Sequence, residues 1–343
     1  MTSSNSTISD FIAMLKGLTI DQRKELFDLI YNPTLQVQVK DIQNFFKTST
    51  KNKNDSVNKN REQILSVILT EQCDAFMLDP THGSKWQMVR TQFSKYLSTL
   101  CSESYIRVSV VLCAGRCYNY DFKISFVLDS GVTIERNVEF KFGKKTICSQ
   151  PQFLSLYTSH PLTIGQPYHE FYILNKCLEQ YLRTDPGIIV EMCEFPTVEQ
   201  YSALVFKTNA ENYSMTSQMR NRKKYHTNEK NKIVNTSITD YLHQTTVNIP
   251  YFIQLLRESQ TDKHYALWCD GEFYYDRMRE EEMTDIVFSR IVNGNVIVCK
   301  NAYCEFWLLL RWKNDKGILG PAWQISIKNR KSPELMQESI CLK

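Results

Sequence analysis

Two residues in the stretch Asn137–Gly143, N-V-E-F-K-F-G, carry side chains that could do chemistry: Glu139 and Lys141. Apolar and polar residues alternate over this stretch, which predicts a strand with one apolar face and one charged face. A carboxylate can bind a divalent cation, and an ammonium group beside it can stabilise developing negative charge. The charged face is therefore either a solvent-exposed sheet surface or part of an active site.

A second carboxylate comes opposite Glu139 when this strand is paired with the one before it. The strand-like runs 119–128 and 132–142 are separated by Asp129-Ser130-Gly131, a three-residue loop whose glycine suits a hairpin bulge. This loop sets Leu128 against Val132. A slip by one residue would set apolar side chains against charged ones along the hairpin, so the pattern fixes the register. On the polar face it pairs Ser125 with Glu135, Lys123 with Asn137, and Asp121 with Glu139.

Asp121 and Glu139 are therefore expected to lie directly opposite each other. Like charges in this position destabilise a sheet, by roughly 0.2–1 kcal/mol for an exposed pair. Two explanations remain open. Either solvent covers the face and the cost is small, or a divalent cation bridges the two carboxylates and turns the repulsion into a binding site.

The elements that must position these residues follow from apolar spacing and capping signals. We expect a helical hairpin over 7–31 and a third helix over 34–46, then a mobile linker over 47–61. A patterned region follows, with helices at 62–78 and 84–101 and strands at 105–113, 119–128 and 132–142. It continues with a short helix over 149–158, a longer helix over 167–182 and an apolar strand over 188–192.

Asp121 on one strand, with Val138-Glu139-Phe140-Lys141 on the next, resembles the active-site signature of the PD-(D/E)XK nuclease superfamily. The order helix, three strands, helix, strand from about residue 84 to 192 is also similar to that family's core. The resemblance covers about a third of the chain. It departs from the family at Tyr120, where proline is common, and in the helix 84–101, which offers no further acid.

The resemblance implies an α/β (α+β) fold whose restriction-endonuclease-like core is a four-stranded mixed sheet flanked by helices. It implies that Asp121, Glu139 and the backbone carbonyl of Phe140 coordinate Mg²⁺, with Mn²⁺ able to substitute. Lys141 would lie near the attacking water. Gln152 resembles a glutamine found in part of the superfamily, and the alternative is that it only caps the helix expected at 149–158.

The function that the resemblance implies is a metal-dependent deoxyribonuclease, a restriction-like or homing-type endonuclease that hydrolyses double-stranded DNA. Cutting both strands at one site would suit a homodimer. The alternative is a non-catalytic nucleic-acid-binding or assembly protein that keeps the nuclease fold. The implied domains are an N-terminal helical segment and basic linker (1–61), the nuclease core (62–195) and a recognition or accessory domain (196–343).

Basic residues outside the core are candidate nucleic-acid contacts. Lys144 and Lys145 follow the E-x-K strand and could touch the scissile strand, or they could be solvated loop residues. The segment Arg220–Lys232 carries six cations, which could supply several phosphate contacts or form a solvated loop. Its first four cations are the candidates Arg220, Arg222, Lys223 and Lys224. The linker 47–61, with five basic residues and one acid, has the same two interpretations.

Composition limits these hypotheses only broadly. The 343 residues, 42% hydrophobic and 23% charged, suit globular domains, and a net charge of +4 neither favours nor excludes a polyanionic partner. Eleven cysteines without zinc-site spacing indicate reduced thiols in an intracellular protein, cytoplasmic or nuclear. No secretory leader or membrane-spanning run is expected. In the C-terminal region, hairpin turns are expected at Asp270-Gly271, Asn293-Gly294 and Asp315–Gly317, and a helix over Glu280–Ile291.

Overall fold

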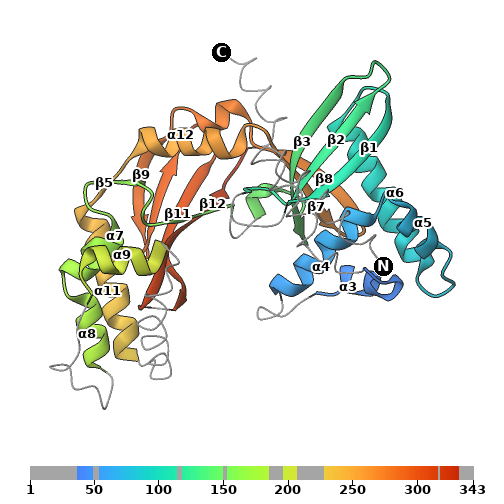
Figure 1. Cartoon of the computed structure of the whole chain (residues 1–343). Coiled ribbons are helices and arrows are strands. Elements are labelled where there is room, and N and C mark those ends of the chain that lie inside the picture. The colour runs from blue at the N-terminus through green and yellow to red at the C-terminus, as the bar shows by residue number, and fades with distance from the viewer. Residues whose placement is uncertain are drawn as a thin grey trace, which may run out of the picture. The chain divides into compact units, whose positions relative to one another are not determined.

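The structure is a computed structural model of the whole chain (Figure 1). It describes residues 37–48, 54–113, 118–149, 153–184, 196–206, 228–315 and 317–331. The helical hairpin predicted at 7–31 and the strand predicted at 188–192 lie outside these residues. Contacts divide the chain into two compact units, residues 1–135 and 136–343, and the boundary falls within one strand, β3 (Thr133–Phe142).

The first unit consists of helices followed by two strands and the start of a third. Its elements are η1 (Val39–Asp41), α3 (Ile42–Phe45), α4 (Asn54–Val67), α5 (Glu71–Met77), α6 (Gly83–Leu100), β1 (Tyr105–Leu112), β2 (Phe122–Leu128) and the start of β3. The predicted helix 84–101 is confirmed as α6. Its apolar positions are buried: Trp86, Val89, Phe93, Tyr96 and Leu100. A Cβ on Gly83 would lie 2.1 Å from the Met77 carbonyl oxygen, so only glycine allows α5 and α6 to approach this closely.

Two sequence predictions in this unit are wrong. The predicted linker 47–61 contains the first two turns of α4, which begins at Asn54. Its Arg61 is buried and donates hydrogen bonds to the carbonyl oxygens of Phe45 (2.9 Å) and Lys47, so the basic residue closes the end of α3. The helix predicted over 62–78 is two helices, α4 and α5, separated by a turn at 68–70.

The hairpin register predicted from the loop is confirmed at its turn. The Leu128 amide donates to the Val132 carbonyl oxygen at 2.8 Å. The Ser125 hydroxyl lies 3.5 Å from the Glu135 carboxylate, and Lys123 forms an ion pair with the same group at 3.0 Å. These contacts are the ones expected when Leu128 faces Val132 and Ser125 faces Glu135.

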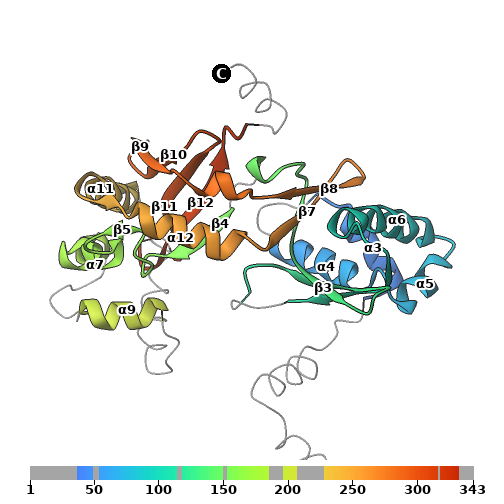
Figure 2. The same ribbon diagram turned by 90° about the horizontal axis from the view of Figure 1, so that it is seen from above.

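In the second unit, residues 137–142 of β3 pair in parallel with β7 (Lys263–Cys269). β7 in turn pairs antiparallel with β8 (Glu272–Arg277), as Figure 2 shows. Asp270 and Gly271 connect them with φ of +52° and +88°, which confirms the predicted turn. The sheet order is β1-β2-β3-β7-β8, and α12 (Ile249–Gln260) precedes β7. The α+β class is confirmed. The restriction-endonuclease-like core and the domain limits at 61 and 195 stay predictions.

A second five-stranded sheet, ordered β4-β12-β11-β10-β9, also belongs to this unit. Its strands are β4 (Leu154–Tyr157), β9 (Val287–Val292), β10 (Val296–Lys300), β11 (Glu305–Asp315) and β12 (Leu319–Lys328). The turns predicted at Asn293-Gly294 and Asp315–Gly317 connect β9 to β10 and β11 to β12. The buried residues of this sheet share one core cluster with helices α7 (Tyr168–Leu174), α8 (Cys177–Arg183), α9 (Val198–Phe206), α11 (Asn228–Gln244) and α12. A short pair, β5 (Thr163–Ile164) and β6 (Thr246–Val247), completes the unit.

Three helix predictions in this unit are wrong. Residues 154–157 of the helix predicted over 149–158 form β4, because this segment pairs with β12. The helix predicted over 167–182 breaks at Lys176, which adopts a left-handed conformation (φ 55°) between α7 and α8. The helix predicted over 280–291 is a short 3-10 turn, η6 (Glu280–Met283), followed by the edge strand β9.

Two further observations bear on the sequence analysis. The eight cysteines in the described residues with an assigned state are all free thiols. None of the helices in the described ranges combines the length and the apolar character that crossing a membrane requires.

Candidate active site

Glu139 and Lys141 lie on the same face of β3, two residues apart, and form an ion pair through Glu139 Oε1. The opposite face is the apolar one, with Val138 fully buried and Phe140 3% exposed. The side chain of Glu139 is only 12% exposed and that of Lys141 is 31% exposed. The charged face of this strand is therefore not a fully solvated sheet surface.

The neighbouring strand β7 brings a second lysine to the same carboxylate. Lys263 forms an ion pair with the other oxygen of Glu139, Oε2, and its side chain is 4% exposed. Its ammonium nitrogen lies 5.3 Å from the centre of the Tyr265 ring, which is within the range of a cation–π interaction. Both oxygens of Glu139 are thus bound to cations, one from its own strand and one from β7.

Tyr265 is the residue of β7 that pairs directly with Glu139 in the parallel register. It is 1% exposed and stacks on Phe153 with the ring centres 6.1 Å apart. Its hydroxyl donates to Gln260 Oε1 at 2.8 Å, and Gln260 is itself buried at the end of α12. The residue paired with Glu139 is therefore a buried core aromatic ring whose hydroxyl has a hydrogen-bond partner.

Glu139 is held between two ammonium groups, those of Lys141 and Lys263. Burial raises the pKa of Glu139, but the two adjacent lysines outweigh it and hold that pKa below its usual range. Glu139 is therefore an ionised carboxylate at a poorly exposed position.

Asp121 lies immediately before β2, in the other compact unit. Its carbonyl oxygen accepts a hydrogen bond from the Cys113 amide at 2.8 Å. The pairing of Asp121 with Glu139 stays a prediction. It holds if the register found at Ser125 and Glu135 continues along the hairpin without a bulge.

The donor set fits a hard divalent cation in chemical type, because carboxylate and carbonyl oxygens are the ligands that Mg²⁺ prefers. The lowered pKa keeps Glu139 in its ionised, ligating form. Within the described residues no group of three or more His, Cys, Asp or Glu side chains is placed to hold a metal. A site built on two carboxylates and one backbone carbonyl does not need such a group.

The other predicted site residues are placed as follows. Lys144 and Lys145 directly follow β3, and the Lys144 amide hydrogen-bonds to the Trp268 carbonyl oxygen at 3.3 Å. Lys145 is exposed, forms an ion pair with Asp270 at 2.8 Å and lies 5.4 Å from the Tyr274 ring centre. Gln152, Arg220, Arg222, Lys223 and Lys224 lie outside the described residues. The structure thus brings Glu139 and Lys141 together and leaves the contacts of the more distant basic residues as predictions.

Lys263 is the site residue that the sequence analysis missed. A signal for it was present. In Lys263–Cys269, K-H-Y-A-L-W-C, the lysine is in phase with Tyr265 and Leu267, so it falls on the same strand face as two core residues. A lysine on a buried face needs a carboxylate partner. That partner cannot be named without knowing that β7 pairs with β3.

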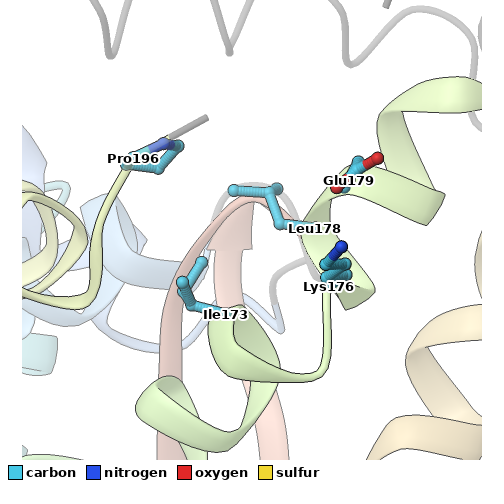
Figure 3. A pocket seen from close by; sticks show the side chains of 5 residues that line it. All are labelled: Ile173, Lys176, Leu178, Glu179 and Pro196. Carbon is cyan, nitrogen blue, oxygen red and sulfur yellow. The ribbon is translucent and has the colours of Figure 1, made fainter. Parts of the chain in front are cut away.

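A small pocket lies elsewhere in the second unit, between α7, α8 and Pro196 (Figure 3). Its lining residues are Ile173, Lys176, Leu178, Glu179 and Pro196. The lining combines one cation and one anion with apolar side chains, and it includes none of the predicted site residues. The candidate active site is therefore the Glu139 cluster, not this pocket.

Comparison with known proteins gives no relative: no family model, no curated protein and no solved structure matches this chain.

Proposed function

We propose that this protein is a Mg²⁺-dependent endonuclease that hydrolyses phosphodiester bonds of double-stranded DNA. The observation that carries the proposal is the Glu139–Lys141 ion pair on the poorly exposed polar face of β3. A carboxylate kept ionised beside a lysine is what metal-assisted hydrolysis of a phosphodiester needs. An E-x-K pair on an ordinary exposed strand would instead be well hydrated.

The order of elements gives further support. The helix, three strands, helix and strand of the nuclease core have counterparts in α6, β1, β2, β3, α12 and β7. In this assignment the last strand of the core is β7, which runs parallel to β3, and the residues 143–248 are an insertion before α12. The core would then reach beyond the limits 62–195 that the sequence suggested.

In the proposed site, Asp121, Glu139 and the carbonyl oxygen of Phe140 hold Mg²⁺. The bound ion would polarise a phosphate oxygen and lower the pKa of a coordinated water. Lys141, the more exposed of the two lysines, orients the attacking water and stabilises the negative charge that develops on the phosphate. Glu139 holds the Lys141 ammonium in place through Oε1 until substrate binds.

The proposed substrate contacts lie outside this centre. Lys144 and Lys145 follow the catalytic strand and would bind the scissile strand, with Lys145 first leaving Asp270. Arg220, Arg222, Lys223 and Lys224 would bind phosphates further along the duplex. A homodimer would supply two centres for cutting both strands.

One observation favours a second candidate, a non-catalytic nucleic-acid-binding or assembly protein. Both oxygens of Glu139 are already bound by lysines, which is also the arrangement of a purely structural ion-pair cluster. In such a protein the cluster would stabilise the β3–β7 pairing and no metal would enter.

Cleavage of supercoiled plasmid DNA separates the two candidates. We expect nicked or linear products with Mg²⁺, none with EDTA, and none from Asp121→Asn with Mg²⁺. Asp121→Asn keeps the size of the side chain and removes only its charge. Binding of DNA without any metal-dependent cleavage would favour the non-catalytic protein, and full activity of Asp121→Asn would exclude the proposed metal site.

A further inference from the structure

One face of the β3–β7–β8 sheet changes from apolar to basic at one end. It is the face of Val138 and Phe140, which are buried, and the register places Ala266 and Trp268 of β7 on it. At the end where β7 begins, the positions of this face are polar: Arg136 on β3, His264 on β7, and Tyr275 and Arg277 on β8. Over these three strands, all of whose residues the structure describes, this face carries no Asp or Glu. Cations and hydrogen-bond donors without an acid among them are the side chains that an anion requires.

Two of these side chains are neighbours across β7 and β8, and a third contacts one of them. His264 pairs directly with Arg277, so their side chains lie next to each other on this face. The Tyr275 hydroxyl lies 3.1 Å from His264 Nδ1, and the two ring centres are 5.8 Å apart. Whichever group donates in this bond, the pair has one further N–H or O–H beyond it. The tyrosine therefore orients the imidazole beside the guanidinium group of Arg277.

The charges around His264 are mainly positive. Burial and the charges of Arg136 and Arg277 lower the pKa of His264 to about 4, and Asp262 acts in the opposite direction with a smaller effect. Asp262 is exposed and directly precedes β7. At neutral pH the ring is therefore an uncharged imidazole in a positive local potential.

The position of Arg277 is fixed from the opposite face of β8. Its carbonyl oxygen accepts a hydrogen bond from Arg330 at 2.7 Å, and the neighbouring Asp276 forms an ion pair with Arg330 at 2.7 Å. The carboxylate next to Arg277 in the chain is thus bound on the other face. The side chain of Arg277 is exposed, and Tyr275 is 38% exposed, so a ligand in solution can reach both.

From this arrangement we propose that Arg277, His264 and Tyr275 bind a terminal phosphate group. A guanidinium group can donate two parallel hydrogen bonds to a phosphate, and the His264–Tyr275 pair supplies a further donor. Arg136 adds positive charge, which favours a terminal phosphate with nearly two negative charges over a singly charged carboxylate. The site lies on the face of β3 opposite Glu139, so the proposal does not rest on the nuclease function.

The test follows the ring resonances of His264 in the full chain by NMR while inorganic phosphate is added at neutral pH and constant ionic strength. The loss of these resonances in His264→Gln assigns them. We expect saturable shifts, and Arg277→Met should raise the Kd for phosphate on the order of tenfold. Tyr275→Phe, which removes only the hydroxyl, should weaken binding by a smaller factor.

Arg290→Met is the matched control, because Arg290 is also an arginine on an edge strand, where it pairs with Glu305 and is 47% exposed. This variant should bind phosphate like the wild type. Thermal unfolding checks that each variant is folded. The absence of saturable shifts in the wild type would overturn the proposal, as would equal affinities of wild type, Arg277→Met and Tyr275→Phe. Acetate that binds as tightly as phosphate would overturn the assignment to phosphate.

The phosphate can belong to a small molecule or to the end of a DNA strand, and two further probes separate these sources. A nucleoside monophosphate that binds at least as tightly as a short duplex with a 5′-phosphate would support the proposal with a small molecule as ligand. Tighter binding of that duplex would support it with a DNA end as ligand. If the same duplex without the 5′-phosphate shifts the His264 resonances equally well, a terminal phosphate is not what the site recognises.

Discussion

Lys263, the first residue of β7, forms an ion pair with Glu139 on the parallel strand β3. This contact joins two segments that are far apart in the sequence, on a strand face that also carries the buried Tyr265. It explains how a carboxylate that is 12% exposed stays ionised. The contact also gives Glu139 a structural role, so a substitution of Glu139 is expected to change the stability of the protein as well as any activity.

Glu139→Gln is expected to destabilise the protein strongly. The substitution leaves the buried Lys263 ammonium without a carboxylate, and breaking a buried pair in this way costs about 3 kcal/mol or more. Glu135→Gln is the matched control, because Glu135 is on the same strand and pairs with Lys123, but is 53% exposed. Its loss should stay within about 0.5 kcal/mol. Denaturant unfolding gives both values, and equal losses would show that the Glu139 cluster is not effectively buried.

Neighbouring glutamates in η6 offer a similar comparison at a second buried cluster. Glu282 is fully buried and binds Arg330 through both oxygens, at 2.6 and 2.8 Å, and Arg279 at 2.7 Å. Glu282→Gln should cost about 3 kcal/mol or more, because two guanidinium groups lose their shared carboxylate. Glu281→Gln, whose partner Arg279 is 3.6 Å away at a 48% exposed side chain, should change unfolding by less than about 0.5 kcal/mol. Chemical denaturation measures both losses, and a larger loss of unfolding free energy for Glu281→Gln than for Glu282→Gln would contradict this account of the cluster.

Acid should destabilise the second unit through His169. Burial lowers the pKa of His169 from 6.5 to about 4, so the folded protein keeps it neutral while the unfolded chain takes up a proton below about pH 6.5. Its contribution, about 3 kcal/mol, is therefore present above pH 6.5 and is lost as the pH falls toward 4. His169→Gln should unfold with a shallower dependence on pH in this window. The remaining slope should come from His264, whose pKa is also lowered to about 4, from His160, whose pKa burial also lowers, and toward the acid end from carboxyls with lowered pKa such as Glu282. If the stability of His169→Gln depends on pH as steeply as that of the wild type, His169 is not a source of the acid destabilisation.

The local sequence pattern was sufficient to predict the hairpin of 119–142 and the position of Glu139 and Lys141 on it. Alternation and a three-residue loop predicted the register that the Ser125–Glu135 contact now confirms. Turn chemistry likewise predicted the three later hairpins, because a glycine in each turn (Gly271, Gly294 and Gly317) adopts a positive φ on local grounds alone. Glu139 and Lys141 were found for the same reason, since their spacing on one strand is a local property.

The pairing of strands that are far apart in the chain could not be predicted from the sequence. Residues 154–157 follow the capping pattern of Ser149 and Gln152, yet they form β4 because β12 provides a strand to pair with. The last strand of the predicted core was expected at 188–192, which lies outside the described residues, and the strand that pairs with β3 in the structure is β7. Lys263 was missed with it, because its role depends entirely on that pairing. The break at Lys176 was missed because no glycine or proline marks it.

Single-turnover cleavage of supercoiled plasmid DNA by Lys141→Ala tests the central claim most directly. The control is Lys123→Ala, which removes another hairpin lysine that pairs with a glutamate of β3. With Mg²⁺ and folded protein in each case, we predict a rate for Lys141→Ala lower by on the order of 10²-fold or more, and a rate for Lys123→Ala within about twofold of the wild type. Equal rates for Lys141→Ala and the wild type would contradict the assignment of this site. A lack of Mg²⁺-dependent cleavage by every form of the protein would contradict it as well.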